Sequence, residues 1–227
     1  MQPLGQRTVL PAPRRGEPTS DEIEREWRRR ARRAGLARVM RASQPEALAA
    51  AVTVATERQL AAHLRAVECR LRRPLRGALE VGCGIGRLTP TIAALAERVL
   101  AVDMTEEMLV EARIACAGLA NVTFHQCTAQ RLPVCRPPMD VAVCVWVLMH
   151  VLDDEGLAEA CRRIAASATH LVLVEYDHAA APVGRYARLR TLEEYLAMLP
   201  GATIVERGEV YHGGDRSFSA LVSLDQS

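Results

Sequence analysis

Short apolar runs alternate with amphipathic segments from about residue 75 to the end of the chain. Apolar runs predict strands at 77–82, 98–102, 121–127, 139–145 and 170–176, and helical periodicity predicts helices at 87–96, 105–117 and 154–167. Strands and helices that alternate in this way are typical of a parallel sheet covered by helices on both faces. The last part of the chain predicts a helix at 191–199 and a hairpin of strands 202–211 and 216–224. We therefore expect an α/β fold for residues 75–227.

The first 74 residues follow a different pattern. Residues 1–19 are rich in proline and are expected to form a disordered tail. The run from Thr19 to Glu22 is a typical helix start, and Ile23, Trp27 and Ala31 recur on one face of the helix that follows. A second helix is expected over 45–71. The predicted organisation is a tail at 1–19, N-terminal helices at 20–74 and a core at 75–227.

The charge balance argues against a general nucleic-acid binder. The 227 residues include 29 basic and 27 acidic side chains, yet eight arginines lie between Arg25 and Arg41. These arginines either contact an acidic partner, such as RNA phosphates, or form the solvated face of an amphipathic helix. The apolar stripe through Trp27 and the lack of interleaved aromatic residues favour the solvated face.

The cysteines and the apolar runs indicate in which cellular compartment the protein lies. Seven cysteines are scattered along the chain without a C-x-x-C pair, which argues for a reducing cytosol and against a zinc site or disulfide framework. The first 20 residues lack the apolar stretch of a signal peptide, and no run reaches the length of a membrane span. We expect a soluble, cytoplasmic protein with no metal and no membrane partner.

A glycine-rich turn after the first core strand suggests a ligand site. Glu80 is followed by Gly82, Gly84 and Gly86, with Arg87 at the position where the dinucleotide pattern G-x-G-x-x-G requires glycine. The spacing E-x-G-x-G-x-G resembles that of class I methyltransferases, which use S-adenosylmethionine. Glycines are also common in tight strand-to-helix turns for structural reasons alone.

A carboxylate after the second core strand supports this resemblance. Asp103 ends the apolar run 99–102 and can accept two hydrogen bonds from a ribose diol. Asp103 can also simply begin the next helix, where Thr105 and the glutamates after it would form the first turn. The next residue, Met104, is expected against the adenine face or in the core.

Three sequence runs narrow the resemblance to one branch of the class I methyltransferases. They are 82–89 (GCGIGRLT), 102–109 (VDMTEEML) and 144–154 (CVWVLMHVLDD). They resemble the α-N-terminal protein methyltransferases, which methylate the free amine of a peptide or protein N-terminus. The resemblance implies a Rossmann-like sheet, mostly parallel with the last strand antiparallel, whose active site the helices of 20–74 cover. S-adenosylmethionine is the implied cofactor.

The resemblance also implies residue roles. The turn formed by Glu80, Gly82, Cys83 and Gly84 would face the methionine part of the cofactor, and Arg87 would pair with its carboxylate. Asp103 would hold the ribose, with Met104 and Thr105 beside the nucleoside. Ala129 and Gln130 would read the adenine edge. Val145 stands where this branch has a polar amide, so the resemblance implies one contact fewer to the methionine end.

The expected chemistry is methyl transfer to an amine. An ammonium nucleophile must first lose its proton, and His150, directly after the fourth core strand, is the candidate general base. Trp146 could contact the amine through a cation–π interaction. Asp177, after the fifth strand, would orient the ammonium, although the register leaves Tyr176 as the alternative. His150 could also be a packing histidine, and Asp177 an ordinary loop carboxylate.

Three functions remain open on the sequence alone. The first is methylation of an amine such as a peptide N-terminus. The second is O- or N-methylation of a small molecule in natural-product tailoring, which uses the same core. The third is a subunit that binds the cofactor without catalysis. In the first two cases the partner is a peptide or small-molecule methyl acceptor.

Overall fold

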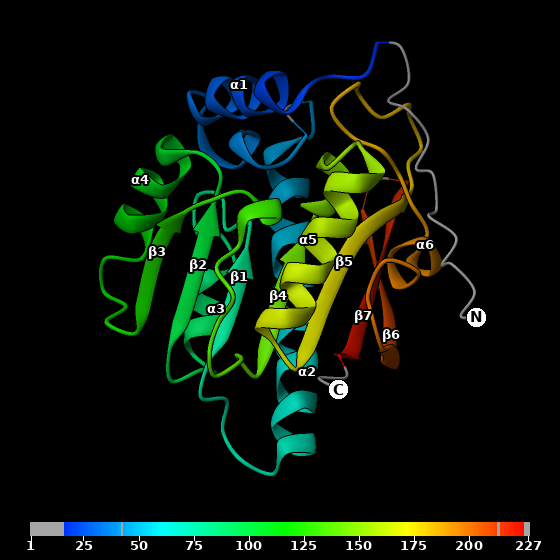
Figure 1. Cartoon of the computed structure of the whole chain (residues 1–227). Coiled ribbons are helices and arrows are strands. Elements are labelled where there is room, and N and C mark those ends of the chain that lie inside the picture. Colours follow the sequence, from blue (N-terminus) through cyan, green and yellow to red (C-terminus); the bar gives the residue numbers. More distant parts are fainter. Residues whose placement is uncertain (1–15, 42, 213, 225–227) are drawn as a thin grey trace, which may run out of the picture.

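A single sheet organises the chain. The computed structural model describes residues 16–41, 43–212 and 214–224, and these residues form a seven-stranded sheet in the order β3-β2-β1-β4-β5-β7-β6 (Figure 1). The strands are β1 (Ala78–Val81), β2 (Val99–Asp103), β3 (Val122–Gln126), β4 (Val141–Val145), β5 (His170–His178), β6 (Ala202–His212) and β7 (Asp215–Leu224). The first five run parallel, and β7 lies antiparallel between β5 and β6. The predicted fold class is confirmed, including its antiparallel last strand.

Two apolar cores lie on opposite faces of the sheet. In β4, Val141 and Val143 belong to the core beneath α2 (Glu46–Leu71), whereas Ala142 and Cys144 belong to the core beneath α5 (Asp154–Ser167). Successive side chains of a strand point to opposite faces, so a strand covered on both faces is apolar throughout. This is why the central strands read as unbroken apolar runs in the sequence.

Several helices are shorter than their apolar patterns suggest. The helix expected at 87–96 is α3 (Thr89–Ala93), because residues up to Leu88 belong to the glycine turn and the chain closes with a tight turn at Leu95. The other core helices are α4 (Glu106–Ala115) and α6 (Leu192–Leu196). Short 3₁₀ turns are η1 (Gly35–Arg38), η2 (Ala129–Arg131) and η3 (Leu148–His150).

Helix α1 (Ser20–Ala31) begins where the sequence predicts. The Thr19 hydroxyl accepts a hydrogen bond from the Glu22 N–H, and the Glu22 carboxylate accepts one from the Thr19 N–H. This capping box satisfies N–H groups that a helix start leaves unpaired. Pro18, within the range expected to be a disordered tail, is buried. Residues 1–15 of that tail lie outside the described residues.

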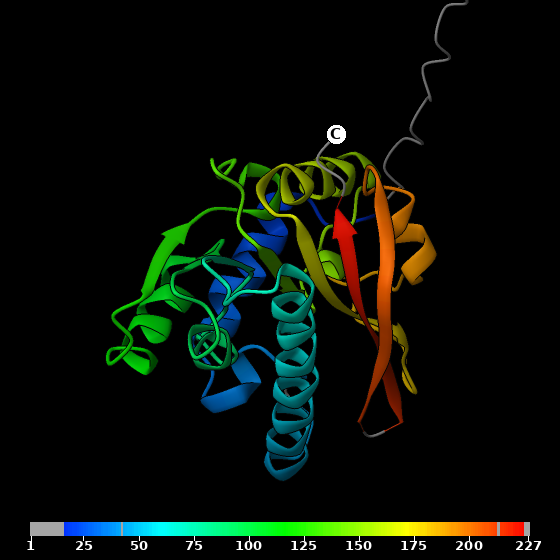
Figure 2. The same cartoon turned by 90° about the horizontal axis from the view of Figure 1, so that it is seen from below.

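The two N-terminal helices take different positions on the sheet. Helix α1 crosses above the carboxyl ends of the strands, and α2 packs along one face, beside the hairpin of β6 and β7 (Figures 1 and 2). On α1, Arg28 pairs with Glu24 and Arg29 pairs with Glu26 at 2.6 and 2.8 Å. These neutralised, exposed arginines fit the solvated helix face rather than a nucleic-acid surface.

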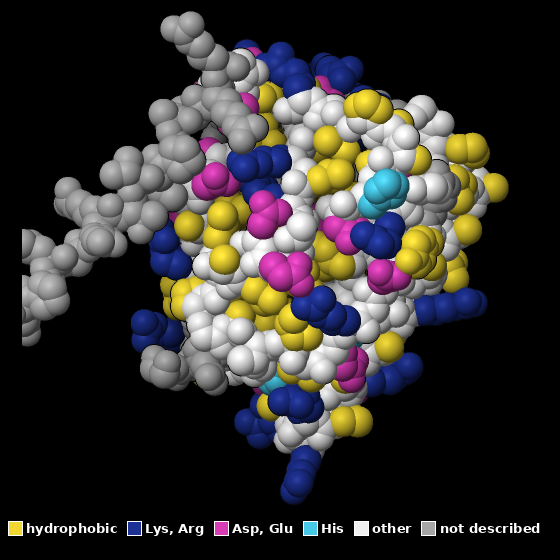
Figure 3. Space-filling model, turned by 90° about the vertical axis from the view of Figure 1, so that its right-hand side faces the viewer, with side chains coloured by type: hydrophobic (Ala, Val, Ile, Leu, Met, Phe, Trp, Pro, Cys, Tyr) yellow, Lys and Arg dark blue, Asp and Glu magenta, His cyan; other side chains and the backbone are white. Residues whose placement is uncertain are grey.

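The face of the molecule over β6 and α6 carries charges of both signs. Basic and acidic side chains alternate there, with scattered apolar side chains between them (Figure 3). Two of the ion pairs on this side are Arg207 with Glu193 at 2.9 Å and Arg216 with Asp177 at 2.9 Å. A mixed surface of this kind produces no large single-sign field for a polyanion.

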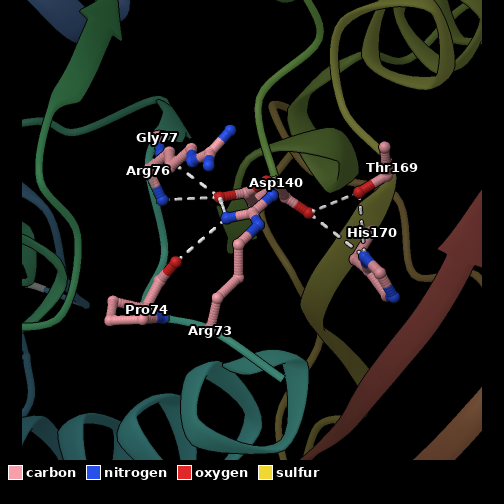
Figure 4. Close-up of polar contacts among 7 residues, drawn as sticks. All are labelled: Arg73, Pro74, Arg76, Gly77, Asp140, Thr169 and His170. Atoms are coloured by element: carbon pink, nitrogen blue, oxygen red, sulfur yellow. Dashed lines mark hydrogen bonds and ion pairs between the residues drawn. The ribbon is translucent and has the colours of Figure 1, made fainter. Parts of the chain in front are cut away.

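A polar cluster ties α2 to the amino edge of the sheet. Asp140, directly before β4, forms a two-pronged ion pair with Arg73, whose nitrogens lie 2.9 and 2.6 Å from the carboxylate oxygens (Figure 4). The same carboxylate accepts the Arg76 N–H at 2.6 Å, and the Asp140 carbonyl accepts the Thr169 hydroxyl at 2.8 Å. The cluster lies at the sheet edge opposite α1 and leaves the carboxyl edge for the candidate site.

Candidate active site

A cavity of about 460 Å³ lies between α1 and the carboxyl ends of β1, β2 and β4. This is the edge at which open parallel sheets bind their ligands. Its wall contains most of the residues that the sequence singles out: Glu80, Gly82, Cys83, Gly84, Arg87, Asp103, Met104, Ala129, Gln130, Val145, Trp146 and His150. Of the described residues, Thr105 and Asp177 are the predicted site residues that do not line it.

The glycine turn needs its glycines. Gly82 and Gly84 have φ values of 72° and 56°, a region that side chains other than glycine rarely adopt. A Cβ on Gly82 would overlap the Val147 side chain, and one on Gly84 would lie 2.7 Å from Cγ1 of Val39. The glycines therefore let Val147 and Val39 pack directly against the turn, and the Gly82 and Cys83 N–H groups fix the turn to the Val102 carbonyl at 2.8 and 2.9 Å.

Asp103 is held by its neighbours in the turn. Oδ2 accepts the Gly84 N–H at 2.9 Å, and Oδ1 accepts the Thr105 N–H at 3.0 Å and the Thr105 hydroxyl at 3.1 Å. Burial raises the pKa of Asp103, and these hydrogen bonds oppose the rise. Thr105 is fully buried, so it orients Asp103 instead of contacting a nucleoside itself.

Arg87 and Trp146 form a stacked pair in the cavity wall. The guanidinium carbon of Arg87 lies 5.0 Å from the centre of the Trp146 ring, within cation–π range, and Nη1 donates to the Thr53 hydroxyl at 3.3 Å. Burial lowers the pKa of Arg87 to about 10, which leaves it charged at neutral pH. Arg87 therefore places a cation over the Trp146 ring, where we expected the acceptor amine.

Glu80 lines the cavity and also connects two elements beneath it. Its carboxylate is buried and accepts the Thr89 hydroxyl at 2.6 Å, which connects β1 to the start of α3. Burial raises the pKa of Glu80 to about 7. Glu80 therefore changes charge near neutral pH at the floor of the cavity.

His150 lies at the end of the cavity beneath α1. Its Nδ1 is 2.6 Å from the Tyr186 carbonyl oxygen, which can only accept, so Nδ1 carries the proton and Nε2 is the acceptor nitrogen. The Trp27 ring meets His150 edge-on, with the two ring centres 4.8 Å apart. Burial lowers the pKa of His150 to about 4. The ring is neutral at pH 7, as a general base must be, but weakly basic.

The structure does not bring Asp177 to His150. The Asp177 carboxylate forms two hydrogen bonds with Arg216, at 3.0 and 2.9 Å, on the hairpin side of β5. Of the two alternatives in this strand, Tyr176 is the one that turns toward the site, with its ring 5.4 Å from that of Trp146. The expected pair of base and orienting carboxylate is therefore absent from the described cavity wall.

Helix α1 supplies residues that the sequence analysis did not assign to the site. They are Ser20, Asp21, Ile23, Glu24 and Trp27. The spacing of Ile23 and Trp27 predicts an apolar stripe on this helix, but a stripe does not say which surface it covers. Val147, which follows Trp146, is a second omission, and its contact with Gly82 joins residues far apart in the sequence.

Part of the chain is similar to known methyltransferases. Residues 78–169 match the family described as a methyltransferase domain. The ubiquinone biosynthesis O-methyltransferase of Methylococcus capsulatus is 37% identical over 93 residues, which are 40% of this chain and 39% of that protein. The chain thus matches about two fifths of this curated relative.

Solved structures share the fold. The N-methyltransferase NodS of Bradyrhizobium japonicum, in complex with S-adenosylhomocysteine, has a TM-score of 0.69 at 15% identity and covers 90% of this chain and 99% of its own. The magnesium protoporphyrin IX methyltransferase of Synechocystis, with bound S-adenosylmethionine, has a TM-score of 0.63 at 21% identity and covers 88% of this chain and 90% of its own.

Residues 78–169 thus match a methyltransferase domain, within a fold that the solved methyltransferases share. The cavity wall contains a glycine turn at Gly82 and Gly84, a carboxylate at Asp103 and a cation at Arg87, and these groups fit S-adenosylmethionine, which those solved structures hold as such or as its product. Among the described residues, no cluster of metal-ligating side chains is found and no helix is long and apolar enough to span a membrane.

Proposed function

We propose that the protein is an S-adenosylmethionine-dependent methyltransferase that methylates a hydroxyl group of a small molecule bound beneath α1. The observation that carries this proposal is the composition of one cavity. Gly82, Asp103 and Arg87, which we assign to the cofactor, line the same 460 Å³ space as Trp27 and His150, which we assign to the acceptor. That volume lies within the usual range for small-molecule sites.

In this proposal the chain's own residues bind and orient the cofactor and the acceptor. Asp103 would accept hydrogen bonds from the ribose hydroxyls, and Arg87 would pair with the cofactor carboxylate. The bound cofactor supplies an activated methyl group on sulfur. Helix α1 closes the cavity from above and excludes water from the acceptor.

The state of His150 favours a hydroxyl acceptor. As a hydroxyl oxygen forms its new bond to carbon, its proton becomes strongly acidic, so a weak base such as Nε2 of His150 can take it. An ammonium must lose its proton before it can attack, which a histidine with a pKa of about 4 does poorly at neutral pH. The name of the relative in Methylococcus capsulatus, an O-methyltransferase, points in the same direction.

A peptide amine is the second candidate. The three runs that resemble the α-N-terminal methyltransferases suggest it, and Asp21, Glu24 and Asp153 place carboxylates in the cavity wall, where they would attract a cation. Against it stand the low pKa of His150 and the ion pair of Asp177 with Arg216.

Matched acceptors test the proposal. The protein is incubated with S-adenosylmethionine labelled in the methyl group, together with pairs of small molecules that differ only in a hydroxyl or an amino group, and with short peptides. We expect label in the hydroxyl compounds, and loss of most of this transfer in His150→Phe at unchanged cofactor affinity. Transfer confined to peptide amines would replace the proposal with the second candidate, and transfer to neither class would refute both.

A further inference from the structure

A buried carboxylate outside the cavity contacts the segment that forms its wall. Glu175, in β5, is fully buried, and its Oε1 accepts the N–H groups of Val147 and Leu148 at 2.9 and 2.7 Å. Its other oxygen, Oε2, has no hydrogen-bond partner among the described residues. A buried carboxylate with one free oxygen lowers stability, so an apolar side chain would suit this core better. Its presence indicates another role.

The turn that Glu175 holds is strained. Trp146 has a φ of 57°, in the left-handed region that a bulky side chain rarely enters. The Trp146 N–H donates to the Val174 carbonyl at 2.8 Å, and the two N–H groups that follow point at Glu175. Strain of this kind persists only where surrounding contacts fix it.

A second buried side chain fixes the far end of the same segment. Arg190 is 3% exposed and donates to the carbonyls of Val151 and Leu152, both at 3.0 Å. The Glu175 carboxyl group thus binds N–H groups at the start of residues 146–152, and Arg190 binds the carbonyls at the end of the same segment. His150 lies between these two anchors.

The segment carries two contacts to the cofactor end of the cavity. The Trp146 ring lies under the guanidinium of Arg87, and the Val147 side chain packs where a Cβ on Gly82 would be. Release of residues 146–148 would let the Trp146 backbone relax, and both contacts would shift. Glu175 touches neither the cavity nor Arg87, so it can act on them only through this turn.

We propose that Glu175 is a positioning residue: by binding residues 147–148 it places Trp146 beneath Arg87 and Val147 against Gly82, and so shapes the cofactor end of the cavity. This inference rests on the proposed function, because Arg87 and Gly82 matter here as cofactor-binding groups.

The two tryptophans of the chain give a direct test. In a Trp27→Phe background Trp146 is the remaining indole, so its emission and its accessibility to a quencher report its position. Glu175→Ala, Glu175→Asp and Glu175→Gln are made in this background. Calorimetry measures the affinity of each for S-adenosylhomocysteine, which binds without reacting. The control is Asp140→Asn, a buried carboxylate that also accepts backbone N–H groups, but at the opposite sheet edge.

We expect Glu175→Ala to expose Trp146 to the quencher and to weaken S-adenosylhomocysteine by about tenfold, since one charge-assisted contact is disturbed. Glu175→Gln keeps an oxygen for the two N–H groups and should stay within about threefold of its parent, whereas the shorter Glu175→Asp should shift both readouts in the direction of alanine. The control should lose thermal stability without moving either readout.

The inference would be overturned if a folded Glu175→Ala kept the Trp146 emission and the S-adenosylhomocysteine affinity of its parent. Equal shifts in the Asp140→Asn control would also overturn it. If alanine prevents folding, an unchanged Glu175→Asp overturns it. A parent that binds no S-adenosylhomocysteine would refute the cofactor part of the proposed function, and the quenching of Trp146 would still decide whether Glu175 positions the turn.

Discussion

The surroundings of His150 determine which ring nitrogen accepts a proton and how basic that nitrogen is. The Tyr186 carbonyl fixes the proton on Nδ1, and burial lowers the pKa to about 4. The unfolded chain binds this proton near pH 6.5, so protonation favours unfolding. The stability that His150 contributes is present above pH 6.5 and is lost as the pH falls toward 4.

We therefore expect His150→Gln, which cannot titrate, to flatten the loss of stability between pH 6.5 and 4. Urea unfolding at several pH values measures this change. His63 and His170, whose pKa values burial also lowers, and Glu80, whose pKa burial raises, remain in both proteins and contribute to the residual slope. Equal slopes in the variant and the parent would contradict the low pKa of His150.

Asp103 gives a prediction for cofactor affinity. Asp103→Ala removes the acceptor for the ribose hydroxyls and also frees the Gly84 N–H, so S-adenosylhomocysteine should bind about tenfold or more weakly. Calorimetry checks this. Glu107→Ala, an exposed carboxylate at the start of α4, is the control and should bind as the parent does.

The sequence could predict that Asp103 and Arg87 lie together at one site because their positions depend on spacing within one strand-turn-helix unit. Asp177 shows where this reasoning ends. Its partner Arg216 lies 39 residues away on β7, and the side of β5 to which each residue points depends on the pairing of those strands. The contacts of Glu175 could not be predicted either, because its partners are backbone N–H groups 27 and 28 residues earlier in the chain.

Among the elements, α1 determines how the cavity is closed. Trp27 contacts His150 from this helix, so Trp27→Ala should open the acceptor end and raise the KM for the acceptor. The affinity for S-adenosylhomocysteine should change less, because the groups assigned to the cofactor come from the strands. Trp27→Phe keeps an aromatic ring and serves as the control. A larger loss of cofactor affinity than of acceptor KM would place Trp27 over the cofactor instead.

The apolar patterns predicted the core strands within a few residues, because strands buried on both faces have few alternatives. They overestimated α3, whose first turn is taken up by the backbone of the glycine motif. They also predicted α1 with its cap at Thr19, yet not its place over the sheet. That place depends on contacts such as Trp27 with His150 and Arg38 with Glu111, which join distant parts of the chain.

At the opposite edge of the sheet, Asp140 holds the end of α2 to β4. Asp140→Ala leaves Arg73 and the Arg76 N–H without their acceptor in a largely buried place, so we expect a loss of about 2–4 kcal/mol in the free energy of unfolding. Urea unfolding checks it. Arg207→Ala breaks an exposed ion pair with Glu193 and should cost less than about 1 kcal/mol. Equal losses would show that the Asp140 cluster is no more than a surface contact.

At the scale of the whole molecule, ligand binding should raise the free energy of unfolding. A ligand that binds only the folded chain stabilises it by about 2.7 kcal/mol at 100 times its Kd, which for a chain of this size is a rise of roughly 5–10 °C in Tm. We expect this rise with S-adenosylhomocysteine, and its loss in Asp103→Ala. NAD at the same concentration should leave Tm unchanged, because Arg87 occupies the position where a dinucleotide turn needs glycine and its side chain projects into the cavity. An equal rise with NAD would mean that the turn accepts a pyrophosphate, and the assignment of Arg87 to a cofactor carboxylate would then be wrong.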